Sequence, residues 1–179
     1  LLAGEPRPTV TQDDLQILDV VLGDLFNFKE FDPAVRARNG RTEILLDAMS
    51  AGASFFLSEG QLHGESFNDP EHAIPDGLSN DLRKRNPKEK IPLIGFKSSD
   101  PRIVVRDLSG MTDILNFSDK FPHALGYVIA WLPGYAEDGR TAVFRASFGP
   151  TAHGATLTYL LARKDGRWTV VWRTTGYYD

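Results

Sequence analysis

Hydrophobic and polar residues alternate along the last third of the chain, and the alternation predicts an antiparallel sheet. Four runs rich in β-branched and aromatic residues show it, over 127–132, 141–148, 155–163 and 168–175. The dipeptide Asp165-Gly166 separates the last two runs and favours positive φ at both positions, as a two-residue type I′ hairpin requires. We therefore expect the four runs to form a four-stranded meander.

The turns also predict a register for this meander. Pairing Lys164 with Arg167 and centring the two longer loops gives the opposite pairs Leu161/Val170, Tyr159/Trp172, Phe144/Tyr159, Ala146/Leu157, Ile129/Phe144 and Trp131/Ala142. One face then collects most of the large apolar side chains: Tyr127, Ile129, Trp131, Ala142, Phe144, Ala146, Phe148, Leu157, Tyr159, Leu161, Trp168, Val170 and Trp172. A one-residue slip would divide this set between both faces, so we expect this register.

An amphipathic helix is predicted over 12–27, near the start of the chain. Thr11 is a suitable N-cap, and Asp13 and Asp14 place negative charge in the first turn. The apolar residues that follow recur at helical spacing: Leu15, Leu18, Leu22, Leu25 and Phe26. We expect this stripe to cover the aromatic face of the meander.

The region between the helix and the meander gives weaker signals. The segment 78–86 predicts a short helix capped by Ser79 and ended by Pro87, 103–105 a short strand, and 117–125 a helical turn interrupted by Pro122. Segment 42–57 fits either a strand or a helix, and 58–77 is rich in loop-forming residues. The fold class is therefore α+β: an N-terminal helix and an irregular middle region packed on a C-terminal four-stranded antiparallel meander.

Size and composition set further limits. With 179 residues, 41% of them hydrophobic, the chain fits a single domain over 11–179 that follows a loose, Pro-rich segment at 1–10. A net charge of −4 argues against nucleic acid as a partner, and no apolar run approaches the roughly 18–20 residues of a membrane span. The absence of cysteine excludes disulfides and thiolate metal sites. The basic cluster of the sequence comprises Arg83, Lys84, Arg85, Lys88 and Lys90, with Asp81 and Glu89 interspersed.

Residues that usually carry chemistry show no catalytic spacing. None of the four histidines occurs in a zinc-binding motif, so we expect no metal and no cofactor. His153 is a candidate because it lies in the loop 149–154 at one end of the sheet. The acidic pairs Asp13/Asp14 and Glu137/Asp138 lie at element ends, where acids cap helices or form turns. The serines lack the G-x-S-x-G context of a hydrolase, so the sequence favours a protein that is not an enzyme.

One row of polar residues on the second face of the meander predicts an anion site. In the register above Arg145 pairs with Thr158, and Thr158 pairs with Arg173. Two guanidinium groups on a rigid sheet would offer several N–H donors to a carboxylate or phosphate group. The alternative is that acidic side chains from elsewhere already neutralise both arginines.

Several spaced residues also give the chain a resemblance. They are Leu78-x-x-Asp81-Leu82-x-x-Arg85-Asn86, Pro92-Leu93, Phe117-x-x-x-Phe121-Pro122-x-Ala124-x-Gly126, Pro133-Gly134-Tyr135, Asp138-Gly139-Arg140-x-Ala142, His153-Gly154, Tyr159-Leu160-Leu161 and Asp165-Gly166-x-Trp168. Over about residues 78–178 the chain resembles a group of uncharacterised bacterial proteins, many with predicted signal peptides. The resemblance implies a shared fold and export to the periplasm or the outside, and it implies no activity. The apolar start at Leu1 fits a signal-peptide remnant or an arbitrary start of the sequence.

Two hypotheses of function follow from these observations. The first is an exported, non-catalytic binding or interaction domain, whose partner is a protein or a small anion. The second is a ketosteroid-isomerase-like cone that binds or transforms a small molecule in a pocket between the N-terminal helix and the sheet. The packing of Tyr159, Trp131 and Trp172 distinguishes them, because a pocket requires these rings to line a cavity.

Overall fold

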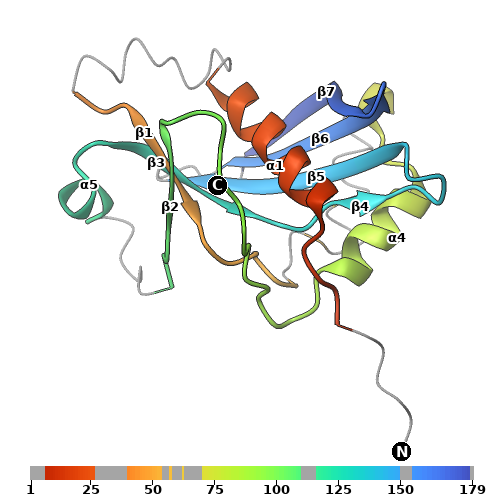
Figure 1. The fold of residues 1–179 in the computed structure, drawn as a ribbon, viewed down its shortest axis with the longest axis horizontal. Coiled ribbons are helices and arrows are strands. Elements are labelled where there is room, and N and C mark those ends of the chain that lie inside the picture. The colour runs from red at the N-terminus through yellow and green to blue at the C-terminus, as the bar shows by residue number, and fades with distance from the viewer. Residues whose placement is uncertain are drawn as a thin grey trace, which may run out of the picture.

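The computed structural model describes residues 7–26, 40–53, 57, 62, 70–109, 116–149 and 155–177. Its helices are α1 (Gln12–Leu25), the 3-10 turn η3 (Pro70–His72), α4 (Asp76–Arg85) and α5 (Phe117–Lys120). Its strands are β1 (Glu43–Asp47), β2 (Ile103–Arg106), β3 (Ala124–Ala130), β4 (Gly134–Tyr135), β5 (Thr141–Gly149), β6 (Ala155–Lys164) and β7 (Arg167–Tyr177). The fold is α+β, as predicted, with α1 lying across one face of a twisted sheet (Figure 1).

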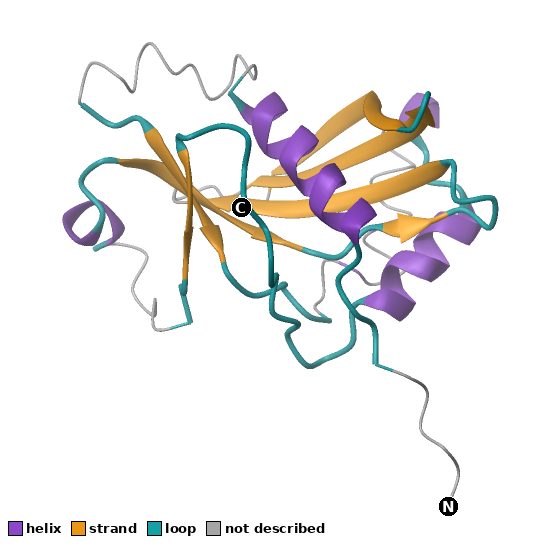
Figure 2. Ribbon diagram, in the orientation of Figure 1, coloured by secondary structure: helices purple, strands orange, loops and turns teal. Residues whose placement is uncertain are grey.

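The seven described strands form one mixed sheet (Figure 2). Its order is β2-β1-β3-β5-β6-β7, and β4 pairs separately with β5. β3, β5, β6 and β7 are antiparallel, which confirms the predicted meander, whereas β1 is parallel to both β2 and β3. The sequence predicted β2 only as a short strand and left β1 open, so it missed this parallel half of the sheet.

The predicted register is confirmed between β5 and β6. Phe144 pairs with Tyr159, Arg145 with Thr158 and Ala146 with Leu157. The hairpin that joins β6 to β7 is also confirmed, because Asp165 and Gly166 both have positive φ, at 49° and 78°.

The pairing of Tyr159 with Trp172 is wrong. A β-bulge leaves Val171 without a partner position, since Leu161 pairs with Val170 and Leu160 pairs with Trp172. Every side chain of β7 beyond the bulge therefore points to the face opposite the one predicted. β7 ends the strand order, and bulges are common in such edge strands.

The register of β3 is also wrong, for a different reason. Ile129 pairs with Ser147 rather than Phe144, and Ala130 pairs with Ala146. The connection between β3 and β5 contains the short strand β4, in which Gly134 pairs with Val143. Centring the connection assumed a loop without a strand of its own, so the prediction placed β3 too far along β5.

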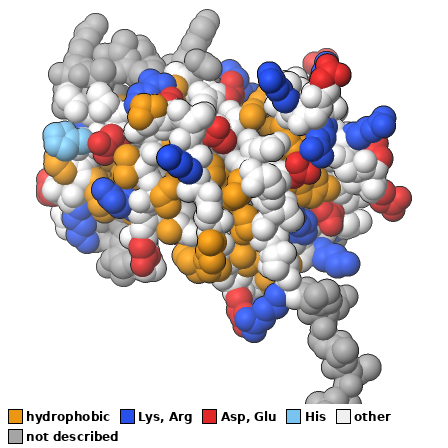
Figure 3. Space-filling view, in the orientation of Figure 1, with side chains coloured by type: hydrophobic (Ala, Val, Ile, Leu, Met, Phe, Trp, Pro, Cys, Tyr) orange, Lys and Arg blue, Asp and Glu red, His pale blue; other side chains and the backbone are white. Residues whose placement is uncertain are grey.

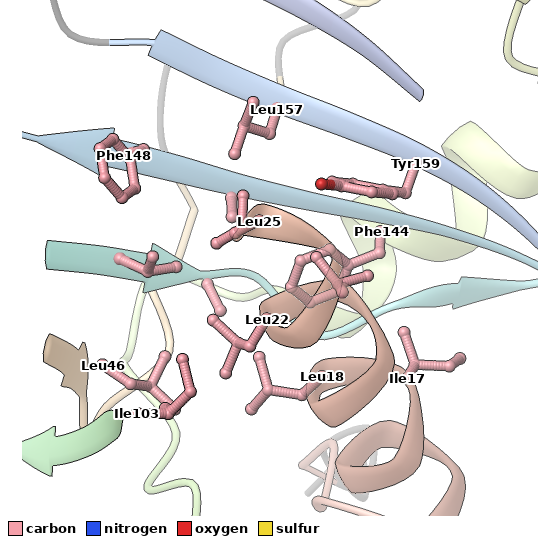
Figure 4. Packing of buried hydrophobic residues seen from close by; sticks show 14 of the residues in the cluster. Ile17, Leu18, Leu22, Leu25, Leu46, Ile103, Phe144, Phe148, Leu157 and Tyr159 are labelled. Atoms are coloured by element: carbon pink, nitrogen blue, oxygen red, sulfur yellow. The ribbon is translucent and has the colours of Figure 1, made fainter. Parts of the chain in front are cut away.

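α1 confirms the predicted helix and covers the aromatic face of the meander. Thr11 and Asp14 form a reciprocal capping box at its start. Figure 4 shows its apolar side chains, including Leu22 and Leu25, lying against residues of β5 and β6. Phe144 and Tyr159 are 1% and 0% exposed, so this interface is filled by side chains.

α4 packs on the opposite face of the sheet, where Leu78 and Leu82 join Trp131 and Val143 in a second cluster. The helix begins at Asp76, two residues before the predicted start at Leu78, and Ser79 lies inside it rather than at its cap. Pro75 precedes the helix with no side-chain cap, and the helix ends at Arg85, one residue before the predicted end at Asn86. No helix within the described ranges is long and apolar enough to cross a membrane.

Candidate functional site

The predicted anion row does not form, because the β7 bulge separates its members. Arg145 pairs with Thr158 as expected and is fully buried. Thr158, however, pairs with Thr174, and Arg173 pairs with Tyr159 on the face that α1 covers. There one guanidinium nitrogen of Arg173 donates to both carboxylate oxygens of Asp24, at 2.7 and 2.6 Å. The two arginines therefore lie on opposite faces of the sheet. The other candidate, His153, lies outside the described residues.

The structure instead brings together residues that the sequence marked only as a motif. The side chain of Asn86, 1% exposed, joins the end of α4 to the segment after β3. Its amide donates to the carbonyls of Leu82 and Leu132, and its Oδ1 accepts from the Leu132 amide, each at 2.8 Å. At Gly134 a Cβ would lie only 2.4 Å from the Leu82 nitrogen, so only glycine allows this approach of α4 to β4.

A buried charge pair completes this junction. Two nitrogens of Arg85 donate to the two oxygens of Asp14, at 2.7 and 2.9 Å, in a bidentate pair. The Tyr135 hydroxyl donates to the same carboxylate at 2.7 Å, and its ring centroid lies 5.0 Å from the Arg85 guanidinium carbon. We call Asp14, Arg85 and Tyr135 the Arg85 cluster. It joins α1, α4 and β4, three elements far apart in the sequence.

The electrostatics of the Arg85 cluster favour fixed protonation states. Burial on its own would raise the pKa of Asp14, but the Arg85 guanidinium, the Thr11 amide and the Tyr135 hydroxyl outweigh it and hold that pKa below its usual value. Burial, followed by the negative charge of Asp14, raises the pKa of Tyr135 above its usual value. The carboxylate is thus ionised and the phenol neutral at pH 7, so neither is set up to exchange a proton there.

An open groove with a volume of about 1110 Å³ lies beside the Arg85 cluster. Its walls are the C-terminal half of α4, the N-terminal arm 7–10 and the segment 87–94, which Figure 1 shows meeting below α1. We call it the α4 groove. Five basic and two acidic side chains line it: Arg7, Lys84, Arg85, Lys88, Lys90, Asp81 and Glu89. Its local charge of +3 contrasts with the net charge of −4 for the chain.

Three of these five cations already have acidic partners. Arg85 pairs with Asp14, Arg7 lies 3.1 Å from Glu89, and Lys90 lies 3.8 Å from Asp47. Lys84 and Lys88 are exposed and make no ion pair in the part of the chain that the structure describes. The positive charge that the groove offers a ligand is therefore concentrated in these two lysines.

Apolar side chains lie beside the two lysines. Ile94 is 78% exposed, one of only two large hydrophobic residues so exposed among the described residues. It lines the groove together with Pro87, Ile91 and Pro92. On the face that Figure 3 shows, basic and acidic side chains are interspersed with exposed apolar ones and form no continuous basic surface. The α4 groove thus offers a ligand two cations and an apolar wall.

Sequence reasoning found the basic side chains of this site but not their arrangement. Lys84, Arg85, Lys88 and Lys90 were recognised as a cluster in the sequence, whereas the partnership of Arg85 with Asp14 and Tyr135 was not. The available signal was the pair of motifs around Arg85-Asn86 and Pro133-Gly134-Tyr135, which the structure shows to be the two sides of one junction.

No group of three or more potential metal ligands occurs among the described residues. Comparison of the chain with protein-family models, with curated proteins and with solved structures finds no match.

Proposed function

We propose that the protein is a non-catalytic binding domain whose α4 groove holds an anionic partner. The observation that carries the proposal is the exposure of Lys84 and Lys88 in a groove where the other cations are internally paired. Two unpaired ammonium groups beside an apolar wall attract a ligand that carries negative charge and some apolar surface. Export, which the resemblance implies, is part of the same proposal and is compatible with a binding role outside the cytoplasm.

The packing of the sheet supports a binding domain over a ketosteroid-isomerase-like pocket protein. Such a pocket would lie between α1 and the sheet, where Phe144 and Tyr159 are almost completely buried against the helix. Trp131 and Trp172 belong to the cluster on the other face of the sheet. The indole N–H of Trp131 is already bonded to the Gly52 carbonyl, at 2.7 Å, which fits a structural role.

The chemistry of the Arg85 cluster also supports a binding role. It gathers a carboxylate, a phenol and a guanidinium, which are groups that active sites use. Here each of them is hydrogen-bonded to another member of the cluster, and the pKa shifts keep the carboxylate charged and the phenol neutral. The cluster fixes the wall of the α4 groove, because Arg85 also donates to the Thr9 carbonyl of the N-terminal arm at 3.4 Å.

A binding assay with three anionic probes tests the proposal. The probes are a polyglutamate peptide, a sulfated oligosaccharide and vesicles that contain an anionic phospholipid. We expect at least one probe to bind the wild-type protein, with an affinity that falls as salt is raised. The double variant Lys84→Glu/Lys88→Glu should weaken that binding by about tenfold or more.

The control is Lys120→Glu/Lys164→Glu, which changes the net charge equally at exposed positions outside the groove. It should retain the wild-type affinity within about twofold. Failure of all three probes, or an equal loss in both double variants, would show that the α4 groove is not an anion-binding site.

A further inference from the structure

The floor of the α4 groove contains backbone groups that form no hydrogen bond within the described part of the chain. Residues 91–93 are held against residues 48–50, through the bonds from the Ser50 amide to the Ile91 carbonyl and from the Leu93 amide to the Ala48 carbonyl, at 2.8 and 2.9 Å. The next segment toward α4, residues 88–90, has no such partner. Its backbone amides and carbonyls make no hydrogen bond in the described part of the chain. Residues 88 and 89 form a bend, and the Lys88 carbonyl lies against Gly52, so the unbonded backbone groups left for a ligand are those of Glu89 and Lys90.

We propose that the partner of the α4 groove is an extended polypeptide segment in which acidic and apolar side chains alternate. The inference rests on the proposed function and specifies the class of ligand. A peptide can bond the unpaired backbone groups of Glu89 and Lys90 through its main chain, without a strand ladder because residues 88 and 89 form a bend. Its carboxylates would meet Lys84 and Lys88, and its apolar side chains would lie on Ile94 and the prolines that flank it.

The size and shape of the groove fit a chain segment better than a compact ligand. Its volume of about 1110 Å³ lies just above the upper end of the range of about 300–1,000 Å³ typical of small-molecule pockets, so it has room for a short chain segment. The groove is open to solvent rather than enclosed, and its walls come from three separate segments. Three prolines, Pro8, Pro87 and Pro92, limit the freedom of these walls and reduce the entropy lost on binding.

Other polyanions match fewer of these features. Nucleic acid binding depends on many phosphate contacts, whereas the groove offers two unpaired lysines. A membrane surface is flat, whereas the lysines and Ile94 line a groove whose walls come from three segments of the chain. A sulfated oligosaccharide would use the lysines and leave the apolar wall exposed.

Two labelled peptides of equal charge and length test the inference. Glutamate alternates with leucine in the first peptide and with serine in the second. We expect the wild-type protein to bind the leucine peptide about tenfold more tightly, because only leucine buries apolar surface on Ile94. The variant Ile94→Ser should bind both peptides equally, and its melting temperature should match the wild type because Ile94 is 78% exposed.

A third peptide examines the backbone contact. It is the leucine peptide with N-methyl groups on alternate residues, which removes amide donors without changing charge or side chains. We expect it to bind more weakly than the unmodified peptide by about fivefold or more.

The outcomes separate this inference from the proposed function. If neither peptide binds and the vesicles and oligosaccharide also fail, the groove is not an anion site and both proposals fall. If the leucine and serine peptides bind equally, or only vesicles or the oligosaccharide bind with dependence on Lys84 and Lys88, the groove binds anions but the polypeptide assignment is wrong. Tighter binding of the leucine peptide that Ile94→Ser removes supports the inference.

Discussion

Asp14 lies where three segments distant in the sequence meet. Its backbone and carboxylate cap α1 through Thr11, its carboxylate binds Arg85 of α4, and it accepts a hydrogen bond from the Tyr135 hydroxyl of β4. The side chains of Asp14 and Arg85 are 3% and 14% exposed. Removing one member of such a pair leaves the other buried without its partner, which costs more than the loss of a surface ion pair.

We expect Asp14→Asn to lower the free energy of unfolding at pH 7 by about 3–5 kcal/mol, measured by urea denaturation. The control is Asp13→Asn in the neighbouring pair with Arg163, in which both side chains are about one-third exposed (33% and 37%). It should cost about 1 kcal/mol or less, because solvent screens an exposed pair. Equal effects of the two substitutions would show that the buried pair contributes no more than the exposed one.

The effect of Asp14→Asn should also depend on pH. The pKa of Asp14 is lowered in the folded protein, so its ionised form stabilises the fold at every pH above the unfolded value of about 3.9. This contribution is lost as the pH falls through the folded pKa, because the folded carboxyl then also becomes protonated. The difference between wild type and variant should therefore shrink below about pH 4. A difference that stays constant from neutral to acidic pH would contradict the assigned pKa shift.

The strands show which features of a fold local sequence can predict. The two-residue hairpin at Asp165-Gly166 and the β5–β6 register follow from turn chemistry and alternation, and both are confirmed. The bulge at Val171 could not be predicted, because Val170 and Val171 are both apolar and either fits a strand position. The parallel pairing of β1 with β2 joins segments more than fifty residues apart. No tight turn connects them, so local sequence does not indicate that they pair.

The bulge changes what is expected of Trp172. A fully buried tryptophan would cost about 3–5 kcal/mol on truncation to alanine, but this ring is half-buried and lies 5.1 Å from the His72 ring, between centroids. We therefore expect Trp172→Ala to lower the free energy of unfolding by less than Phe144→Ala does. The Phe144 ring is 1% exposed, so its truncation should cost about 3–5 kcal/mol. Chemical denaturation of the two variants gives the comparison. A larger loss for Trp172→Ala would place that ring in the main core.

At the scale of the whole molecule, the Arg85 cluster and the α4 groove adjoin each other, because Arg85 belongs to both. The sequence supplied the basic side chains and the α4 motif, but the groove depends on the N-terminal arm, α4 and segment 87–94 meeting in space. Such a meeting depends on contacts over long sequence separations, as between Arg85 and Asp14, 71 residues apart. A pattern read within one short window carries no information on these contacts.

α1 is the element on which the whole arrangement depends. Six of its residues are buried, and each of its four acidic side chains reaches a different segment of the chain, with Arg163, Arg85, Ser98 and Arg173 among the partners. Deleting residues 1–25 would expose the aromatic face of β5 and β6 and leave Arg85 and Arg173 without their carboxylates. We expect this deletion to abolish the cooperative unfolding transition, as measured by circular dichroism against temperature. Removal of residues 1–6 alone, in contrast, deletes none of these contacts. A cooperative transition in the longer deletion would mean that another segment covers the sheet.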